Sequence, residues 1–588
     1  MTTGQTALKL LRYRPGLFLA TIFFRGLDDI TPFFTGLIMK AFFDALTGHA
    51  DAGFTAWTLV ALFVVLEGVD RVVLFAAALM GARWYFAVQS LLRKNMLEAV
   101  LQVRHPRAVS GSSGEVTNRF RDDVQAVTSY LEQYIHLWGN MIFAGLAVSY
   151  MAKIDVAVTA VTVLPCVLII TVVNVARRHI RRFRTAQRVA TERATNFANE
   201  MFQSVLAVQV ATTEGHTVSH FRDLNEARRK STLVDNLFNQ LLMSINFNIS
   251  HISTGVILLL VADQMQAGTF SVGDFALFTT YVSEVARSGA LVGSVMAQHK
   301  RAEVSLGRMA STIEEESPAA LVAYGPIYLK ESPPPVVAVQ RSEADILHEL
   351  AITGLSHVFA GSENGVRGID LRIQPGTFNV VTGRIGAGKT TFLRTVLGVL
   401  PLQSGEIRWN GEPVADPKTF FAPPRCAYTP QVPRLFSETL ADNILMGLPD
   451  GEEVLQRAVR LGVMEEDLPT LELGLETMVG PRGVKLSGGQ VQRTAAARMF
   501  VREAELYVFD DLSSALDVET ENLLWDRVFA SRQGACLVVS HRRPALQRAD
   551  QIVVLKEGRV EAVGTLQELL TSCEEMQRLW RGDLGSDG

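Results

Sequence analysis

Long apolar runs dominate the first half of the sequence, and each is close to the length of a helix that crosses a membrane. Such a helix needs about 20 mostly apolar residues. This pattern predicts a transmembrane domain of six helices, and the buried helices of a soluble protein are a remote alternative. The runs cover Leu17–Ala41, Phe54–Met80, Ile135–Met151, Val156–Ala176, Leu241–Ala262 and Phe275–Met296.

The distribution of positive charge predicts which side of the membrane each connection faces. Phe42–Trp57 and Asp263–Asp274 contain no Lys or Arg, whereas the segments after the second and fourth runs are strongly basic. Because Lys and Arg concentrate on the cytoplasmic side, both termini and the second half of the chain are expected in the cytoplasm. We expect a multi-pass protein, and we place it in a bacterial plasma or inner membrane.

The two basic segments are much longer than ordinary connections and are rich in helix-favouring residues. The membrane helices are therefore expected to continue into the cytoplasm. The chain would reverse direction at Gly111–Gly114 in the first segment and near Leu206–Gly215 in the second. These two coupling regions would be well placed to contact a cytoplasmic domain.

Polar and charged residues inside the predicted spans have two interpretations. They would line a substrate cavity, or they would hold helices together and neutralise one another at helical spacing. For the charges we favour the second interpretation, and for the uncharged stripe both stay open. The charges are Arg25, Asp28, Asp29, Glu67, Asp70 and Arg71, and the stripe is Asn246, Ser250, Ser253 and Thr254.

The second half of the chain alternates short strand-like and helix-like segments, which is typical of an α/β domain. An acidic stretch ending at Pro318 and a proline run at Pro333–Pro335 separate it from the first half. We expect a transmembrane domain at 1–312, a linker at 313–345 and an α/β P-loop NTPase domain at 346–588.

A glycine-rich stretch in this second domain has the setting of a phosphate-binding loop. Asn379–Val381 is typical of a buried strand, Gly383–Thr390 fits the pattern G-x-x-x-x-G-K-[ST], and Thr391–Leu397 is typical of a helix. Backbone N–H groups and the helix N-terminus would receive phosphates, Lys389 would reach the β- and γ-phosphates, and Thr390 would hold Mg²⁺. The residues expected to bind ATP here are Gly383, Arg384, Ile385, Gly386, Ala387, Gly388, Lys389, Thr390 and Thr391.

Three further features point to the same nucleotide chemistry as the phosphate loop. Leu506–Asp510 is typical of a buried strand whose final carboxylate lies near Mg²⁺, and Asp511 would orient or activate a water molecule. His541 follows another strand, at a point where a contact to the γ-phosphate would be useful. A second glycine-containing helix start would receive the nucleotide of another copy or partner, because this chain's own phosphate loop is already complete. It consists of Leu486, Ser487, Gly488, Gly489 and Gln490.

Composition excludes other classes of protein. The net charge of −4 gives no basic face for nucleic acid, so no nucleic-acid partner is expected. Apolar residues make up 48% of the chain, which is high for a soluble enzyme. The four cysteines are isolated in sequence and form neither a metal-binding pattern nor a disulfide framework.

The ordered set of motifs resembles the ATP-binding cassette (ABC) transporter family, specifically exporter-type half-transporters. Gly383–Thr390 matches the Walker A motif and Leu486–Gln490 matches the family signature. The resemblance implies that Gln431, in Tyr428–Gln431, senses the γ-phosphate and Mg²⁺. It also implies that Ser514–Asp517 is the D-loop with Asp517, that His541 is the switch histidine, and that Phe359 stacks on adenine.

The chain departs from the family pattern at the position of the general base. Most members have Glu where this chain has Asp511, and Leu512 stands where Pro is common. A carboxylate one methylene shorter loses alignment with the water molecule. Together with the intact signature, this favours one subunit of a heterodimer whose own site is slow, although a slow homodimer stays open.

The resemblance implies ATP-driven export of a drug-like molecule, lipid or peptide by a dimer of half-transporters, with ATP and Mg²⁺ as cofactors. Two alternatives stay open. One is an exporter-fold importer of metal chelates, which transport measurements with defined direction would distinguish. The other is a slowly hydrolysing, nucleotide-gated regulatory membrane protein, which an ATPase assay would distinguish.

Overall fold

The computed structural model folds into two compact units, one formed largely by residues up to 331 and the other largely by residues from 332 onward. Each unit is described separately. The structure describes residues 2–48, 55–102, 113–313, 319–329, 332, 341–449, 451–481, 483–512, 516–531 and 534–582.

The first unit is built from helices, and each apolar run predicted from the sequence lies on a different long helix. The first residue of the second run, Phe54, falls outside the described residues. By length and composition, one helical stretch of the described chain, Gly114–Ile154, has a window apolar enough to cross a membrane, with mean hydropathy 1.2. The long helices are α2 (Pro15–Leu46), α3 (Ala56–Gln102), α5 (Val124–Ile154), α6 (Val156–Gln203), α8 (Glu214–Gln266) and α9 (Val272–Ala310).

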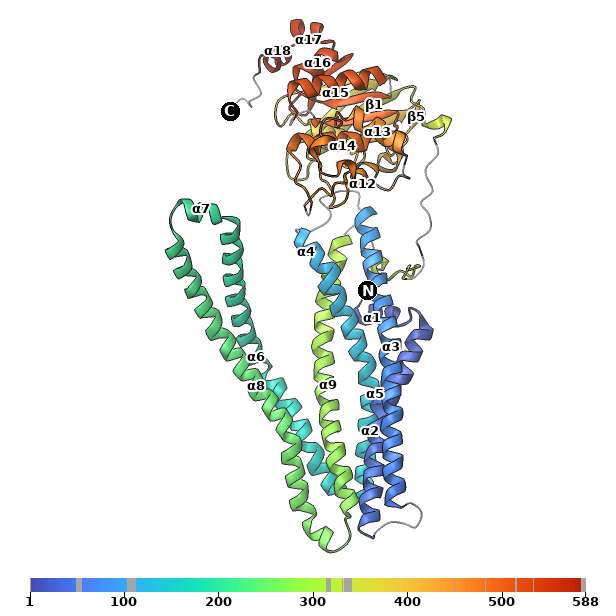
Figure 1. Cartoon of the computed structure of the whole chain (residues 1–588), viewed down its shortest axis with the longest axis vertical. Coiled ribbons are helices and arrows are strands. Elements are labelled where there is room, and N and C mark those ends of the chain that lie inside the picture. The colour runs from blue at the N-terminus through green and yellow to red at the C-terminus, as the bar shows by residue number, and fades with distance from the viewer. Residues whose placement is uncertain are drawn as a thin grey trace. The chain divides into compact units, whose positions relative to one another are not determined.

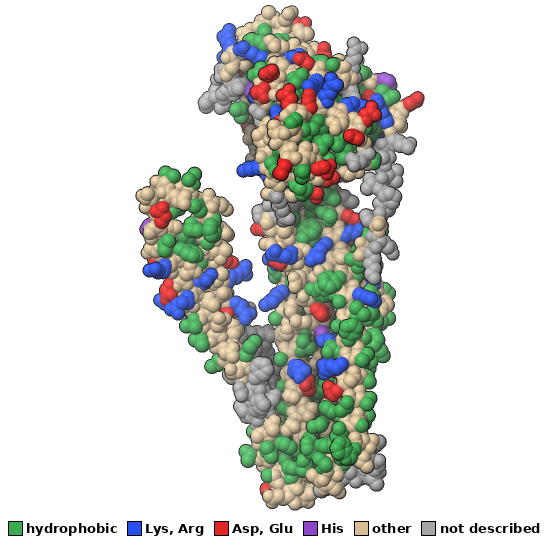
Figure 2. All heavy atoms as spheres, viewed as in Figure 1, with side chains coloured by type: hydrophobic (Ala, Val, Ile, Leu, Met, Phe, Trp, Pro, Cys, Tyr) green, Lys and Arg blue, Asp and Glu red, His purple; other side chains and the backbone are tan. Residues whose placement is uncertain are grey.

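Helix α2 packs against α3, α5 and α9, while α6 and α8 lie side by side as an antiparallel pair (Figure 1). Large buried side chains fill the bundle, including Trp84 and Leu91 of α3 and Phe143 of α5. Figure 2 shows Lys and Arg side chains on the part of the α6–α8 pair toward α7, and hydrophobic side chains gathered at the end of the unit farthest from α7. This separation follows the alternation of apolar and basic segments in the sequence.

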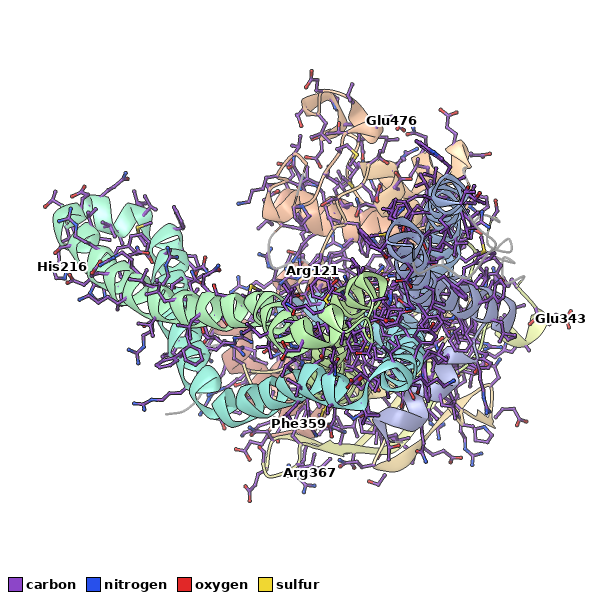
Figure 3. All side chains as sticks on the ribbon, turned by 90° about the horizontal axis from the view of Figure 1, so that it is seen from below. Arg121, His216, Glu343, Phe359, Arg367 and Glu476 are labelled. Carbon is purple, nitrogen blue, oxygen red and sulfur yellow. The ribbon has the colours of Figure 1, made fainter. Side chains whose placement is uncertain are left out.

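The α6–α8 pair is closed by the short helix α7 (Val205–Val210) and the turn that follows it. The sequence predicted a reversal at Leu206–Gly215, and the chain does turn there, since α8 begins at Glu214. His216, in the first turn of α8, lies at the far tip of the pair (Figure 3). Most of the other predicted reversal, at Gly111–Gly114, lies outside the described residues.

Residues 319–329, which the sequence assigned to a linker, pack on the helical unit. Leu321 and Val322 are buried, and the Asn95 side-chain amide donates to the carbonyls of Leu321 and Ala323, both at 2.9 Å. The Tyr13 hydroxyl donates to the carbonyl of Gly325 at 3.2 Å. This part of the chain therefore extends the first unit, and the predicted acidic and proline-rich stretches on either side lie outside the described residues.

The second unit contains a six-stranded sheet with strand order β10-β9-β3-β8-β7-β6. Strands β6, β7, β8, β3 and β9 pair in parallel, and β10 forms an antiparallel hairpin with β9. All residues of β3, β7 and β8 are buried, as expected for a parallel sheet covered on both faces. The strands are β3 (Phe378–Thr382), β6 (Cys426–Thr429), β7 (Leu506–Asp510), β8 (Ala535–Val539), β9 (Gln551–Lys556) and β10 (Arg559–Gly564).

A second sheet of four antiparallel strands has the order β2-β1-β4-β5. Helix α10 (Lys389–Val396) follows β3, α14 (Gly488–Phe500) precedes β7, and α15 (Val518–Ser531) precedes β8. The predicted α/β domain with a phosphate loop between strand and helix is confirmed. The strands of the second sheet are β1 (Leu350–Val358), β2 (Gly365–Ile373), β4 (Ser404–Trp409) and β5 (Glu412–Pro413).

The order of the central strands determines where the candidate site lies. Strand β8 lies between β3 and β7, and all three run in the same direction, so their carboxyl ends meet at one edge of the sheet. The phosphate loop follows β3, Asp510 ends β7 and His541 follows β8. Ligands of open parallel sheets bind at this edge.

Candidate nucleotide-binding site

The phosphate loop depends on glycines that adopt backbone conformations unfavourable for other residues. Gly383, Gly386 and Gly388 have φ values of 148°, 86° and 98°. A side chain at Gly383 would also collide with the carbonyl of Leu555 on the neighbouring strand β9. The loop therefore keeps its shape only with glycine at these positions, and it leads directly into the N-terminus of α10.

Lys389 is the first residue of α10, and its ammonium group points back over the loop. The Nζ atom donates to the carbonyl of Gly383 at 2.6 Å and to the carbonyl of Arg384 at 2.8 Å. Burial lowers the pKa of Lys389, and the charges of Asp511 and Asp510 oppose that change. The amine is thus held at the loop by acceptors that anionic phosphate oxygens could replace.

Thr390 and Asp510 bring the phosphate loop and the end of β7 together. The Thr390 hydroxyl donates to Asp510 Oδ1 at 3.0 Å, and the Tyr428 hydroxyl donates to Oδ2 of the same carboxylate at 3.4 Å. Asp510 is fully buried, and burial raises its pKa while the bond from Thr390 opposes that increase. Burial also raises the pKa of Tyr428 to about 12, so this phenol stays a hydrogen-bond donor at neutral pH.

Asp511 contacts Gln431 through one carboxylate oxygen. Gln431 Nε2 donates to Asp511 Oδ2 at 3.3 Å, while Oδ1 is buried and has no hydrogen-bond partner within the described part of the chain. Burial raises the pKa of Asp511, and the charges of His541 and Lys389 are among the opposing effects. The backbone of Asp511 has φ 53°, in the left-handed region, and its N–H donates to the carbonyl of Val539 at 3.1 Å.

Phe359 lies apart from these carboxylates, just after β1 on the hairpin that leads into β2. Its N–H donates to the carbonyl of Asn364 at 3.1 Å, and its half-buried ring contacts His357 edge-on at 4.9 Å between centroids. Figure 3 shows Phe359 and Arg367 close together on this hairpin. The position of the ring is thus set by a backbone hydrogen bond of the turn and by its contact with His357.

The signature residues form the capped start of α14. Ser487 and Gln490 make a reciprocal capping box, with Gln490 Oε1 accepting from the Ser487 N–H at 2.9 Å. Gln490 Nε2 donates to Asp467 Oδ1 at 3.2 Å, and Arg493 pairs with the same carboxylate at 2.7 Å. Leu486 packs on the hydrophobic core, which leaves Gly488 and Gly489 to form the first turn of the helix.

The D-loop residues Ser514 and Ala515 lie outside the described residues, whereas Asp517 is described. Asp517 Oδ1 accepts from the Thr520 N–H at 2.8 Å, and Oδ2 accepts from the Thr520 hydroxyl at 2.7 Å. These hydrogen bonds lower the pKa of Asp517. In this chain Asp517 therefore serves as the cap of α15, which the motif alone did not predict.

Two further residues of this region carry contacts for which sequence reasoning gave no role. Tyr428 was noted only as part of the motif around Gln431, yet it supports the Asp510 carboxylate. Arg542, next to His541, donates to the carbonyl of Leu516 at 2.8 Å and pairs with buried Glu521 at 2.9 Å. The one sequence signal that could have suggested these contacts of Arg542 is a basic residue directly after the histidine at the end of the strand.

These groups fit a nucleoside triphosphate together with a divalent cation. Thr390, Asp510 and Gln431 offer the hydroxyl, carboxylate and amide oxygens that Mg²⁺ prefers. Oδ1 of Asp511, which has no hydrogen-bond partner among the described residues, is a potential acceptor for a water molecule, and the loop N–H groups with Lys389 provide donors for phosphates.

Comparisons with known proteins match both halves of the chain. The family model of the ABC transporter transmembrane region matches residues 17–287, and the ABC transporter family model matches residues 366–514. The probable multidrug resistance ABC transporter ATP-binding/permease protein YheI of Bacillus subtilis is 25% identical over 527 residues, 85% of each chain. An ATP-dependent lipid A-core flippase of Chromohalobacter salexigens is 28% identical over 473 residues, 78% of this chain and 77% of that protein.

The fold also matches a solved structure described as a bacterial Atm1-family ABC exporter with ATP bound. The TM-score is 0.72 at 19% sequence identity, and the match covers 98% of this chain and 99% of that one. The expected family, the fold class and the ATPase activity are confirmed by these matches. The chain is an ATPase of the ABC transporter family with the exporter fold, in which a helical membrane region and a nucleotide-binding cassette are joined in one polypeptide.

Proposed function

We propose that this chain is one subunit of a dimeric exporter that uses ATP to move an amphipathic molecule across a membrane. The relatives named as a multidrug resistance protein and as lipid A-core flippases support a drug-like or lipid substrate over a peptide. The observation that carries the proposal is the joint arrangement of Lys389, the Thr390–Asp510 pair and the Gln431–Asp511 pair at one sheet edge.

Each residue of this arrangement has a role in holding the nucleotide. The phosphate loop from Gly383 to Thr391 and Lys389 bind the phosphates, and Phe359 stacks on adenine. Thr390, Asp510 and Gln431 hold Mg²⁺, which when bound neutralises the charge that develops on the transferred phosphoryl group.

Asp511 and His541 orient the attacking water molecule. Asp511 accepts a proton from the water through Oδ1, which has no hydrogen-bond partner within the described residues, while Gln431 holds the other oxygen in place. His541 contacts the γ-phosphate. Because aspartate is one methylene shorter than glutamate, hydrolysis at this site is slow.

The signature helix α14 completes a site on a second half-transporter. The glycine-containing N-terminus of α14 receives the phosphates of the partner's nucleotide. The phosphate loop of this chain receives the phosphates of the nucleotide bound to this chain. An intact signature beside a short base favours a heterodimer, in which this chain supplies its signature to the partner's faster site. ATP between two cassettes favours their closed state and thereby biases the membrane helices toward release on the far side.

The chain lies in a membrane with both termini and the cassette in the cytoplasm, as the positions of its Lys and Arg residues favour. Asp511 also favours a second function, in which ATP binding acts as a switch with little turnover. Turnover of the assembled complex that stays near the uncatalysed rate would support the switch over the exporter.

Lys389→Ala tests the nucleotide site. Removing the ammonium group eliminates the charge-assisted contact to the phosphates, so photolabelling of this chain by 8-azido-ATP should fall by about tenfold or more. Labelling is measured on the full chain in native membranes after the subunits are separated on a gel. Unchanged labelling of this chain would show that the loop does not bind nucleotide.

The matched control is Lys418→Ala, on the short helix α11 (Pro417–Phe420) of the same cassette. It removes the same charge away from the loop and should leave labelling within about twofold of the unsubstituted chain. An equal loss in both variants would indicate a general effect of charge or folding.

A further inference from the structure

A buried ion pair joins the phosphate loop to the last helix among the described residues. Arg384 Nε lies 2.8 Å from Oε1 of Glu575 in α18 (Glu574–Arg581). The two side chains are only 11% and 3% exposed, so the pair is largely shielded from water. Arg384 lies inside the phosphate loop, whereas Glu575 belongs to none of the motifs that define the site.

The backbone of Arg384 holds the phosphate-binding lysine. Its carbonyl accepts from Lys389 Nζ at 2.8 Å and from the Ala387 N–H at 3.1 Å. The side chain of Arg384 is therefore anchored at α18 while its carbonyl shapes the loop. Glu575, Arg384 and Lys389 form a continuous chain of contacts from the C-terminal helix to the nucleotide site.

Helix α18 is itself firmly attached to the cassette, which makes it a suitable anchor. Met576 and Leu579 are buried in the main hydrophobic cluster of the unit. Arg543 donates to the carbonyl of Trp580 at 3.0 Å and lies 5.0 Å from the centre of its ring. Glu575 is thus held by packing that does not involve the loop.

The loop has room to move if this anchor is lost. A cavity of ≈ 220 Å³ lies beside the pair, lined by residues 384–387 of the loop, residues 555–557 at the end of β9, and Glu575. Three glycines give the loop additional freedom. Removing one member of a buried pair also leaves the other charge without compensation, which favours rearrangement.

We propose that Glu575 is a positioning residue for nucleotide binding, acting through Arg384 to hold the phosphate loop and Lys389 in the binding geometry. The C-terminal helix thereby becomes part of the nucleotide site, and displacement of α18 weakens ATP binding without touching any motif residue. This role concerns nucleotide binding and does not depend on which substrate the chain transports.

The test replaces Glu575 with glutamine, which keeps the shape of the side chain and removes its charge. In the full-length protein in lipid nanodiscs, Glu575→Gln should raise the Kd for MANT-ATP and the KM for ATP by about tenfold. The kcat at saturating ATP should change by less than about twofold, because the reacting groups are untouched. A purely structural role would instead lower the thermal midpoint with Kd and KM unchanged.

Glu574→Gln is the matched control. Glu574 is the neighbouring residue of the same helix, is exposed, and pairs with Arg578 one turn later at 2.6 Å. Its replacement should change the Kd by less than about twofold. Equal Kd values in the two variants would overturn the proposal.

A double variant provides a second, independent outcome. In Arg384→Gln/Glu575→Gln both charges are absent, so the Kd for MANT-ATP should be no higher than the Kd of either single variant. If the two residues acted independently, the fold increases in Kd of the single variants would multiply. If Glu575→Gln does not yield folded protein, Glu575→Asp replaces it and should raise the Kd by a smaller factor, and no rise would overturn the proposal. Failure of the unsubstituted chain to bind MANT-ATP would refute the proposed function, whereas normal binding insensitive to Glu575 would refute only this inference.

Discussion

At the scale of single residues, the proposed role of Asp511 predicts that its short side chain limits how quickly this chain's own site hydrolyses ATP. One oxygen accepts a hydrogen bond from Gln431 at 3.3 Å, and the other is buried without a hydrogen-bond partner among the described residues. Asp511→Glu extends the carboxylate by one methylene toward the water molecule. Since misplacement of about 1 Å can cost on the order of 10²-fold in rate, ATPase turnover should rise by about tenfold or more. Phosphate release by the purified complex in nanodiscs measures this.

The same extension at the neighbouring carboxylate should have the opposite effect. Asp510 is fully buried and its oxygens are bonded to Thr390 and Tyr428. Asp510→Glu therefore overpacks the strand end and should lower turnover. If Asp511→Glu leaves the rate unchanged, Leu512 or the partner's signature limits the reaction instead.

Residue roles could be predicted from the sequence where the contacts are local. Gly383, Lys389 and Thr390 lie within one short loop, so their spacing determines which chemistry they share. Glu575 could not be found in this way, because it meets Arg384 only after a helix far along the chain has packed on the cassette. Asp517 has a local role that the motif hides, since its side chain caps α15.

At the scale of elements, the crossing of α2 and α9 requires a glycine. A side chain at Gly36 would collide with the Tyr281 ring, whose hydroxyl donates to the carbonyl of Phe33 at 2.6 Å. The ring also stacks on Phe33 and meets Phe143 edge-on, so it cannot easily move. Gly36→Ala should therefore destabilise the helical unit by about 1–3 kcal/mol, measured as a lower thermal midpoint in detergent.

Gly26→Ala is the control on the same helix, because no described atom lies within 4 Å of the position its new methyl group would take. Alanine favours helix over glycine by up to about 1 kcal/mol, so this variant should be as stable as the parent or slightly more stable. A similar loss of stability in both variants would show that the loss does not come from a collision with Tyr281.

The sequence predicted where the helices lie and also that they continue beyond their apolar runs. Apolar runs give the position of each membrane helix, and α3 and α8 extend far beyond those runs because polar, helix-favouring residues continue the same backbone. Residues 319–329 were expected to be a linker from their composition. Their backbone carbonyls are bound by Asn95 and Tyr13, and such contacts leave no periodic pattern in the sequence.

At the scale of the whole molecule, the chain carries an intact signature and a short base, and the two features belong to different composite sites. In a homodimer, both sites would contain Asp511 and both would be slow. In a heterodimer, this chain's signature completes a site that contains the partner's base, so one fast site suffices for transport. We favour the heterodimer because it gives a role to both the intact signature and the short base of this chain.

This prediction can be tested on the protein in its own membrane. The chain, carrying an affinity tag, is purified in mild detergent, and the intact complex is weighed by native mass spectrometry. We expect a second half-transporter in a one-to-one ratio, with glutamate at the position that corresponds to Asp511. A complex of two copies of this chain would contradict the heterodimer. Both sites would then depend on Asp511, so the rate gain from Asp511→Glu would report on the whole transporter, and its absence would favour the nucleotide-gated switch.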